Sequence, residues 1–253
     1  MCTLLFAVDA HPRYRLVVAA NRDEFYGRPT AAAHWWPDAP QVLAGRDLQA
    51  GGTWLGVARD GRWAALTNVR DPRDIRPGAP SRGALVAEFL RGDAPADAYL
   101  RSIAPGRYQG FNLVAGDPDG VWYLSQKEDA PRRLAPGVYG VSNAQLDTPW
   151  PKVERGKAGL RALLGRAEIG ADELLALLAD RSPAADEALP DTGVGLELER
   201  ALSPLFIAMP GYGTRSSTAL VVEAGGAVRL RELTVRPGAE PDAVEVGFVA
   251  PQR

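Results

Sequence analysis

The stretch CTLLFAVDAHPRYRLVVAANRDEF, residues 2–25, contains two apolar runs separated by a short polar bend. The bend includes His11-Pro12, and this order of runs predicts an antiparallel β-hairpin. In an antiparallel pair, the start of the first strand lies opposite the end of the second. The only cysteine of the chain, Cys2, is therefore expected next to the polar residues 21–24 that end the second run.

Short turns predict three further hairpins. Asp60-Gly61, Asp119-Gly120 and Gly225-Gly226 each separate two strand-like runs. Asp-Gly and Gly-Gly pairs suit the positive φ angles of two-residue hairpin turns. Two more strands are expected at residues 138–142 and 244–249.

Helical patterns are fewer than strand patterns. Apolar residues recur at helical spacing in four segments, residues 81–92, 95–103, 149–167 and 170–181. Hairpins interspersed with a few helices predict an α+β fold of antiparallel sheets with helices packed outside, rather than a parallel βαβ fold. We expect residues 1–253 to form one domain, with an exposed loop at residues 182–197.

The overall composition excludes several kinds of partner and site. With 29 basic and 31 acidic residues, the net charge of −2 provides no basic field for nucleic acid. No apolar run approaches the roughly 18 residues of a membrane span, and the first residues lack a secretory signal pattern, so we expect a cytoplasmic protein. One cysteine and two histidines, His11 and His34, offer neither a disulfide nor a usual metal-ligand set, so no metal or cofactor is expected.

The position of Cys2 indicates a specific chemistry. Removal of the initiator methionine would leave a thiol and a free α-amine on adjacent carbons of one residue. An α-amine has a pKa of about 7.7–8.0, so it can accept the proton of the thiol and activate it as a nucleophile. The alternative is an inert cysteine buried on the first strand.

The four residues Asn21-Arg22-Asp23-Glu24 continue a strand that begins with apolar residues. Side chains alternate between the two faces of a strand, so Asn21 and Asp23 share one face and Arg22 and Glu24 share the other. Polar groups in this position are costly to bury unless they are paired. They form either a solvated strand end or a preorganised polar network beside Cys2.

An aromatic segment is a second candidate for ligand contact. His34, Trp35 and Trp36 follow one another before a proline, and Trp54 occurs soon after. Trp35 and Trp36 either cover an apolar ligand pocket or anchor a loop in the core.

Several motifs together resemble one protein family. They are, in chain order, MCTLLF, LVVAANRDEFYGRPT, GGTWLGV, GRWAALTNVRDP, GFNLVAGD, YGVSNAQLDTPWPKV and PGYGTRSSTALVV. The chain resembles the NRDE family of transport and Golgi organisation 2-like proteins over nearly its whole length. That family is more distantly similar to amino-terminal nucleophile hydrolases of the choloylglycine hydrolase and penicillin V acylase type. The resemblance implies a four-layer αββα sandwich with the nucleophile on the first strand.

The resemblance also implies a set of site residues. The catalytic candidates are Cys2, Asn21, Arg22, Asp23, Asn68, Asn143 and Arg215. The substrate-binding candidates are Glu24, Trp35, Trp36, Tyr212, Thr214 and Ser216.

Each catalytic candidate has an expected role. Asn68 and Asn143 resemble positions that stabilise an oxyanion, and Asp23 would orient the α-amine. Arg22 or Arg215 would lower the pKa of the thiol. One spacing departs from the hydrolases, in which an aspartate follows the arginine by three residues, because Arg22 and Asp23 are adjacent here.

Two functions remain open at this stage. The first is an amino-terminal cysteine amidohydrolase that cleaves a small or lipid-like N-acyl substrate through an acyl-Cys2 intermediate. The second is a non-catalytic carrier of haem or an acyl-lipid metabolite, in which the NRDE residues form a structural network. In both cases the partner is a small molecule or an acyl lipid.

Overall fold

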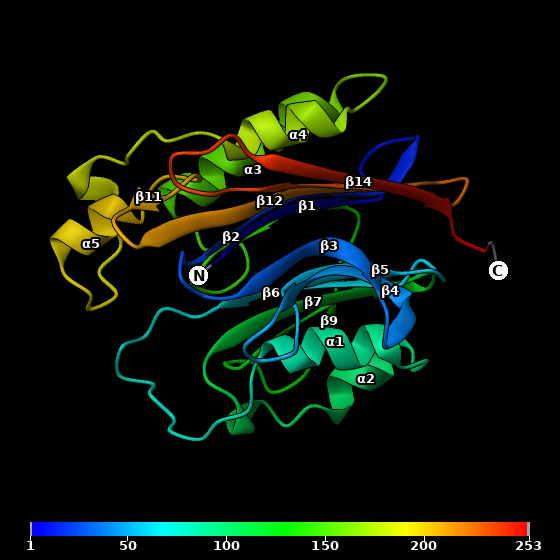
Figure 1. Cartoon of the computed structure of the whole chain (residues 1–253), viewed down its shortest axis with the longest axis horizontal. Coiled ribbons are helices and arrows are strands. Elements are labelled where there is room, and N and C mark those ends of the chain that lie inside the picture. Colours follow the sequence, from blue (N-terminus) through cyan, green and yellow to red (C-terminus); the bar gives the residue numbers. More distant parts are fainter. Residues whose placement is uncertain (1, 252–253) are drawn as a thin grey trace.

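The computed structural model describes residues 2–251. In this range the strands form two antiparallel sheets, each with seven strands, stacked face to face (Figure 1). The first sheet has the order β10 (Gly137–Val141), β1 (Cys2–Val8), β2 (Tyr14–Phe25), β12 (Tyr212–Glu223), β13 (Ala227–Thr234) and β14 (Asp242–Val249), and β11 (Ala208–Met209) pairs with β12.

The second sheet follows the order of its strands in the chain. It consists of β3 (Thr30–Trp36), β4 (Ala39–Asp47), β5 (Leu55–Ala58), β6 (Trp63–Asn68), β7 (Phe111–Asp117), β8 (Gly120–Ser125) and β9 (Arg132–Arg133). It is a meander, so it forms largely from contacts between neighbouring segments of the chain.

Helices cover the outer face of each sheet. The described helices are α1 (Gly83–Arg91), α2 (Ala96–Ser102), α3 (Pro151–Leu164), α4 (Ala171–Leu178) and α5 (Leu196–Ala201), with 3-10 turns at Pro105–Arg107 and Asp186–Ala188. Helices α1 and α2 pack on the second sheet, whereas α3 and α4 pack on the first (Figure 1). Within residues 2–251, no helix has both the length and the apolar character that crossing a bilayer requires.

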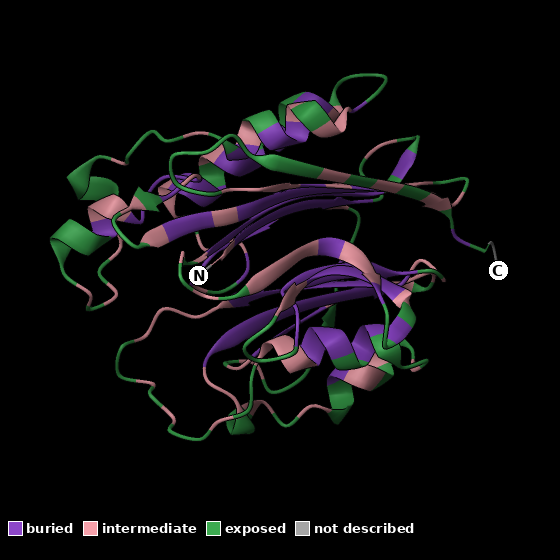
Figure 2. Ribbon diagram, viewed as in Figure 1, coloured by how far each residue is buried: buried purple, intermediate pink, exposed green. Residues whose placement is uncertain are grey.

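Three apolar clusters hold the four layers together. The cluster between the sheets includes Phe6 and Leu220 from the first sheet and Val57 from the second. A second cluster joins the second sheet to α1 and α2 through residues such as Phe89, and a third joins the first sheet to α3 and α4 through residues such as Leu160. The central strands are accordingly buried on both faces (Figure 2).

The architecture confirms the expected four-layer αββα sandwich. All four hairpins are present, namely β1–β2, β5–β6, β7–β8 and β12–β13. The hairpin β3–β4 was not predicted. Its register shifts twice, between Ala31 and His34 and between Trp35 and Trp36, and such irregularities destroy the alternation of period two that identifies a strand in a sequence.

Candidate functional site

The hairpin β1–β2 places the cysteine as expected. Cys2 is paired with Arg22 across the two strands, and the next pair is Thr3 with Asn21. The prediction that Cys2 lies beside the end of the second strand is therefore confirmed. Cys2 is a free, partly buried cysteine.

A cavity of about 320 Å³ opens beside Cys2, at the end of the sandwich where β1 begins. Its walls come from the first hairpin, from the strands and loops of the second sheet, and from the segment that leads into α1. The lining residues are Cys2, Arg22, Asp23, Glu24, Arg28, Asp47, Ala50, Thr53, Trp54, Leu66, Asn68, Ala79, Pro80, Ser81, Arg82, Gly83 and Gln109.

Arg22 and Glu24 project to the cavity side of β2. The Arg22 guanidinium lies over the ring of Trp54, 4.4 Å from its centroid, and donates a 3.2 Å hydrogen bond to the Thr30 hydroxyl. A carboxylate oxygen of Glu24 is 3.8 Å from Arg22. The aromatic face and the carboxylate hold this buried cation in one position next to Cys2.

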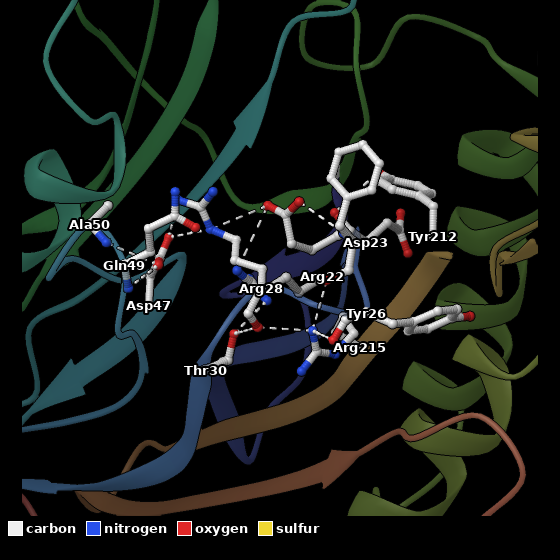
Figure 3. A network of polar contacts seen from close by, with 12 residues as sticks. Arg22, Asp23, Tyr26, Arg28, Thr30, Asp47, Gln49, Ala50, Tyr212 and Arg215 are labelled. Atoms are coloured by element: carbon white, nitrogen blue, oxygen red, sulfur yellow. Dashed lines mark hydrogen bonds and ion pairs between the residues drawn. The ribbon is translucent and has the colours of Figure 1, made fainter. Parts of the chain in front are cut away.

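Arg28, which also lines the cavity, extends this network to Asp47 (Figure 3). Two of its nitrogens donate to Asp47, at 2.9 and 2.7 Å, and its Nε lies 3.8 Å from Glu24. The backbone amides of Gln49 and Ala50 donate to the other oxygen of Asp47. These bonds lower the pKa of Asp47, although its burial opposes them as the largest single effect.

Asn21 projects from the opposite face of β2, toward the helices. Its amide nitrogen donates to the carbonyl oxygens of Leu178 and Leu205, both at 2.9 Å, and its oxygen accepts from Ser217 at 2.6 Å. Every one of these bonds joins β2 to the rest of the first sheet or its helical layer. The structure therefore does not bring the Asn21 side chain to the cavity, and its position indicates an anchoring role.

Asp23 lies next to Cys2 but directs its carboxylate to the same face as Asn21. The carboxylate accepts a 2.8 Å hydrogen bond from Thr214, while the backbone of Asp23 forms a hydrogen bond with the thiol of Cys2. Burial raises the pKa of Asp23, and the attraction of the Lys152 ammonium opposes this rise.

Lys152 is a buried lysine at the start of α3 that the sequence did not single out. Its Nζ donates a 2.9 Å hydrogen bond to the Leu202 carbonyl. Burial lowers the pKa of Lys152 to about 8, and the negative charge of Asp23 counteracts part of that effect. A lone lysine after a proline carries no pattern that would distinguish it from a surface residue, so only the packing of α3 identifies it.

The thiol of Cys2 has a raised pKa. Burial is the main cause, and the nearby charge of Asp23 adds to it, whereas Arg22 and the hydrogen bond with the Asp23 backbone oppose it. The thiol is therefore protonated at neutral pH, and its activation requires a base.

The two asparagine candidates have different positions. Asn68 lines the cavity, and its side chain makes no hydrogen bond to another described residue. Asn143 is buried behind it and donates a 2.9 Å hydrogen bond to the Asn68 carbonyl. Asn68 is thus available to a ligand, whereas Asn143 holds the backbone of Asn68 in place.

The late motif around Arg215 supports the turn after β2 rather than the cavity wall. Arg215 Nη1 donates to the carbonyl oxygens of Phe25, Tyr26 and Arg28, at 2.8, 2.8 and 3.1 Å. Arg215 is the extra residue in a register shift between β12 and β2, and this bulge allows its side chain to reach the turn (Figure 3).

The other three residues of that motif lie behind β2. The Tyr212 hydroxyl donates to the Asp23 carbonyl at 3.1 Å, and Thr214 donates to the Asp23 carboxylate. Ser216 is paired with Arg22 across the strands and is buried, and its hydroxyl has no hydrogen-bond partner among the described residues. None of the three lines the cavity.

The structure places Trp35 and Trp36 outside the cavity beside Cys2. Trp35 packs against Phe248 of β14, and Trp36 is buried and donates to the Ala44 carbonyl, so neither lines the cavity. Trp54 forms the aromatic wall instead. It lies flat against β4 because Gly45 has no side chain, and a Cβ at Gly45 would approach its ring to 2.4 Å.

The sequence also missed three cavity residues, Arg28, Asp47 and Arg82. Arg28 and Asp47 are 19 residues apart in sequence, and Arg82 belongs to a segment that follows β6. Since each comes from a different segment, no local spacing reveals that they meet.

Metal and haem ligation find no support in the site. Among residues 2–251, no group of three or more His, Cys, Asp or Glu side chains could hold a metal ion. Neither His11 nor His34 lines the cavity, so Cys2 is the one lining residue that commonly ligates haem iron. The cavity thus offers haem iron one thiol and no imidazole, which is a poor donor set for haem.

Solved structures of two hydrolases share this fold. The Caenorhabditis elegans ortholog of N-acylethanolamine-hydrolyzing acid amidase aligns with a TM-score of 0.55 at 12% identity, covering 87% of this chain and 92% of that one. The C2A mutant of conjugated bile acid hydrolase from Clostridium perfringens aligns with a TM-score of 0.56 at 10% identity, covering 97% and 92%. The chain thus has the fold of amino-terminal nucleophile hydrolases.

Closer similarity is found among sequences. The Transport and Golgi organization protein 2 homolog of Bos taurus is 42% identical over 95% of both chains, and the Homo sapiens homolog is 37% identical over 92% of both. The family model for Transport and Golgi organisation 2 matches residues 1–237. Because this match covers most of the chain, the protein belongs to the Transport and Golgi organisation 2 family.

Proposed function

We propose that this protein is an amino-terminal cysteine amidohydrolase that acts on a small or lipid-like N-acyl substrate. The observation that carries the proposal is the position of Cys2, which begins the first strand and lines a cavity together with Arg22 and Asn68. The fold shared with two hydrolases supports the assignment.

The first step requires that Cys2 be the amino-terminal residue, after removal of Met1. The free α-amine then accepts the thiol proton, and the thiolate attacks the carbonyl carbon of the substrate amide. Arg22, held over Trp54, stabilises the thiolate. The Asn68 side chain donates to the oxyanion of the tetrahedral intermediate.

The second half of the reaction releases both products. As the intermediate collapses, its C–N bond breaks and the leaving amine takes the proton from the α-ammonium group, which leaves an acyl thioester on Cys2. A water molecule, deprotonated by the α-amine, attacks this thioester and releases the carboxylic acid and the thiol.

Intact-mass spectrometry tests the proposal directly. The purified protein is incubated with a panel of N-acyl amides and acyl thioesters, quenched in acid and weighed. For the unmodified sequence we expect a mass that lacks Met1 and a transient acyl adduct on the amino-terminal peptide. For Cys2→Ala we expect no adduct. A protein that retains Met1 would sink the mechanism, because a peptide-bonded nitrogen is not a base.

One observation favours a second candidate, a non-catalytic carrier of an acyl-lipid metabolite. The raised pKa of the Cys2 thiol leaves it a poor nucleophile while Cys2 is within the chain, and ligand binding in the cavity requires no thiolate. If Cys2→Ala keeps the ligand affinity of the unmodified protein and no substrate forms an adduct, the carrier explains the site and the hydrolase does not.

A further inference from the structure

The charges that line the cavity are unevenly compensated. Three lining residues are cationic, Arg22, Arg28 and Arg82, and three are anionic, Asp23, Glu24 and Asp47. A charged group in a partly buried site requires a partner of opposite charge or solvent. A charged lining residue without such a partner in the protein is therefore available to a ligand.

Two of the arginines are compensated by carboxylates. Arg28 is bonded to Asp47 and lies 3.8 Å from Glu24, and Glu24 also lies 3.8 Å from Arg22. Asp23 directs its carboxylate away from the cavity, where Thr214 donates to it and the Lys152 ammonium attracts it.

Arg82 has no carboxylate partner among residues 2–251. The one hydrogen bond of its side chain there joins Nη1 to the Gly110 carbonyl at 3.0 Å. Burial lowers the pKa of Arg82, and the thiolate form of Cys2 and the carboxylate of Glu24 act on it in the opposite direction. Arg82 is therefore anchored at one nitrogen, partly desolvated, and lines the same cavity as Cys2.

We propose that Arg82 recognises an anionic group on the substrate, a carboxylate or a phosphate, and so selects N-acyl substrates whose cleaved amine carries a negative charge. This inference rests on the proposed function, because it takes the cavity beside Cys2 as the substrate site. A guanidinium has five N–H donors in a planar fork, so with Nη1 anchored the others remain to bind an oxyanion.

Three probes with the same acyl chain separate charge from size. They are N-octanoylglycine, which carries a carboxylate, O-phospho-N-octanoylethanolamine, which carries a phosphate, and N-octanoylethanolamine, which is neutral. The measurement is the concentration of each probe that protects Cys2 from alkylation by iodoacetamide, a neutral reagent. Protection reports occupancy of the cavity, so the experiment does not require turnover.

The variants are Arg82→Gln, which removes the charge, and Arg82→Lys, which keeps the charge but not the fork. Arg73→Gln is the matched control, because Arg73 is exposed on the same connecting segment and is paired with Asp71. A thermal melt of each variant shows that it is folded, and Arg82→Lys keeps the test valid should Arg82→Gln fail to fold.

In the unmodified protein, we expect an anionic probe to protect Cys2 at a concentration at least about 10-fold lower than the neutral probe requires. In Arg82→Gln, protection by that probe should require a concentration about 10- to 100-fold higher, the effect of a lost charge-assisted hydrogen bond. Protection by the neutral probe should be unchanged in Arg82→Gln, and protection by every probe should be unchanged in Arg73→Gln. The carboxylate and phosphate arms identify which anion is preferred.

Equal protection by all three probes, or an equal loss for all three in Arg82→Gln, would overturn the proposal. A shift of the alkylation pH profile in Arg82→Gln without any change in probe preference would also overturn it, because Arg82 would then act on the thiol alone. If the anionic probes protect but no acyl adduct ever forms, the assignment of Arg82 stands and the hydrolase proposal fails.

Discussion

Glu232 of β13 is a carboxyl group buried between the two sheets, with 2% of its surface exposed. One oxygen accepts a 2.7 Å hydrogen bond from the amide of Ala33 in the second sheet, and the other accepts from Thr218 in the first. Burial raises the pKa of Glu232 to about 7. The Glu232 side chain thus joins the two sheets, and its carboxyl group keeps its proton to a higher pH than an exposed glutamate does.

The raised pKa has a direct consequence for stability. Between about pH 4.5 and pH 7 the folded protein holds a proton that the unfolded chain releases, so stability from this group is present at low pH and lost as pH rises through 7. In Glu232→Gln the amide can accept from Ala33 and donate to Thr218. Relative to the unmodified protein, its free energy of unfolding should rise by about 3 kcal/mol from pH 4.5 to pH 8.

Urea unfolding at several pH values measures this difference. Glu240→Gln, at an exposed position, serves as the control and should follow the unmodified protein at every pH. A Glu232→Gln curve parallel to the unmodified one would show that the pKa of the buried carboxyl group is the same in the folded and the unfolded state.

Asn68 allows a prediction about the reaction. Its side chain lines the cavity without a bond to another described residue, so Asn68→Ala should lower kcat for an N-acyl substrate about 100- to 1000-fold while KM changes little. Gln109→Ala is the comparison, because it removes another amide from the cavity wall. A loss that appears only in KM would assign Asn68 to ground-state binding instead.

At the scale of elements, the start of α1 is held against the second sheet by close backbone contact. A Cβ on Gly52 would lie 2.4 Å from the backbone of Gly83, and the Thr53 amide donates to the Gly83 carbonyl at 3.1 Å. Arg82 directly precedes this contact. The position of Arg82 in the cavity therefore depends on a glycine in a different loop.

Gly52→Ala should push α1 away from that loop. We expect a loss of about 1–3 kcal/mol in the free energy of unfolding, together with weaker protection of Cys2 by the anionic probe. Gly106→Ala is the control, since a Cβ there has no neighbour within 4 Å. If Gly52→Ala is as stable as Gly106→Ala, the contact is not tight in solution.

How far the sequence predicts the site depends on which elements are involved. The proximity of Cys2 to the polar end of the second strand follows from one local hairpin, and it was predicted correctly; the structure adds that its partner there is Arg22. The direction of Asn21 could not be predicted, because its partners Leu178 and Leu205 lie more than 150 residues away. Alternation identified the two faces of β2, but only the tertiary packing showed which of them meets the cavity.

At the scale of the whole molecule, the apolar layer between the sheets unites both halves of the structure. Leu220 of β12 is fully buried in this layer. A shared core of this kind predicts that the two sheets unfold together, as one domain.

Leu220→Ala should therefore destabilise the whole protein by about 2–5 kcal/mol. Differential scanning calorimetry is expected to show one transition at a lower temperature, with calorimetric and van't Hoff enthalpies that agree. Leu48→Ala, at a position that is 58% exposed, should leave the transition nearly unchanged. Two separate transitions would contradict a single cooperative domain.

Antiparallel sheets with helices outside were predictable because turns such as Asp60-Gly61 and Gly225-Gly226 mark hairpins locally, and buried helices leave a clear apolar period. The stacking of two sheets was implied only by the family resemblance. The pairing of β2 with β12 was not, since those strands are separated by most of the chain. Without that pairing, the sequence could not indicate that Thr214 would contact Asp23.

The alternation within residues 21–24 also separates two ways in which an inherited change could cause loss of function. Substituting Asn21 removes the hydrogen bonds to Leu178 and Leu205, and cells should respond by degrading the misfolded product, so little of it would accumulate. Substituting Arg22 leaves those bonds in place and instead removes a cation from the cavity wall. Two neighbouring residues of one motif would then fail in different ways, Asn21 through the packing of the helical layer and Arg22 through the lining of the cavity.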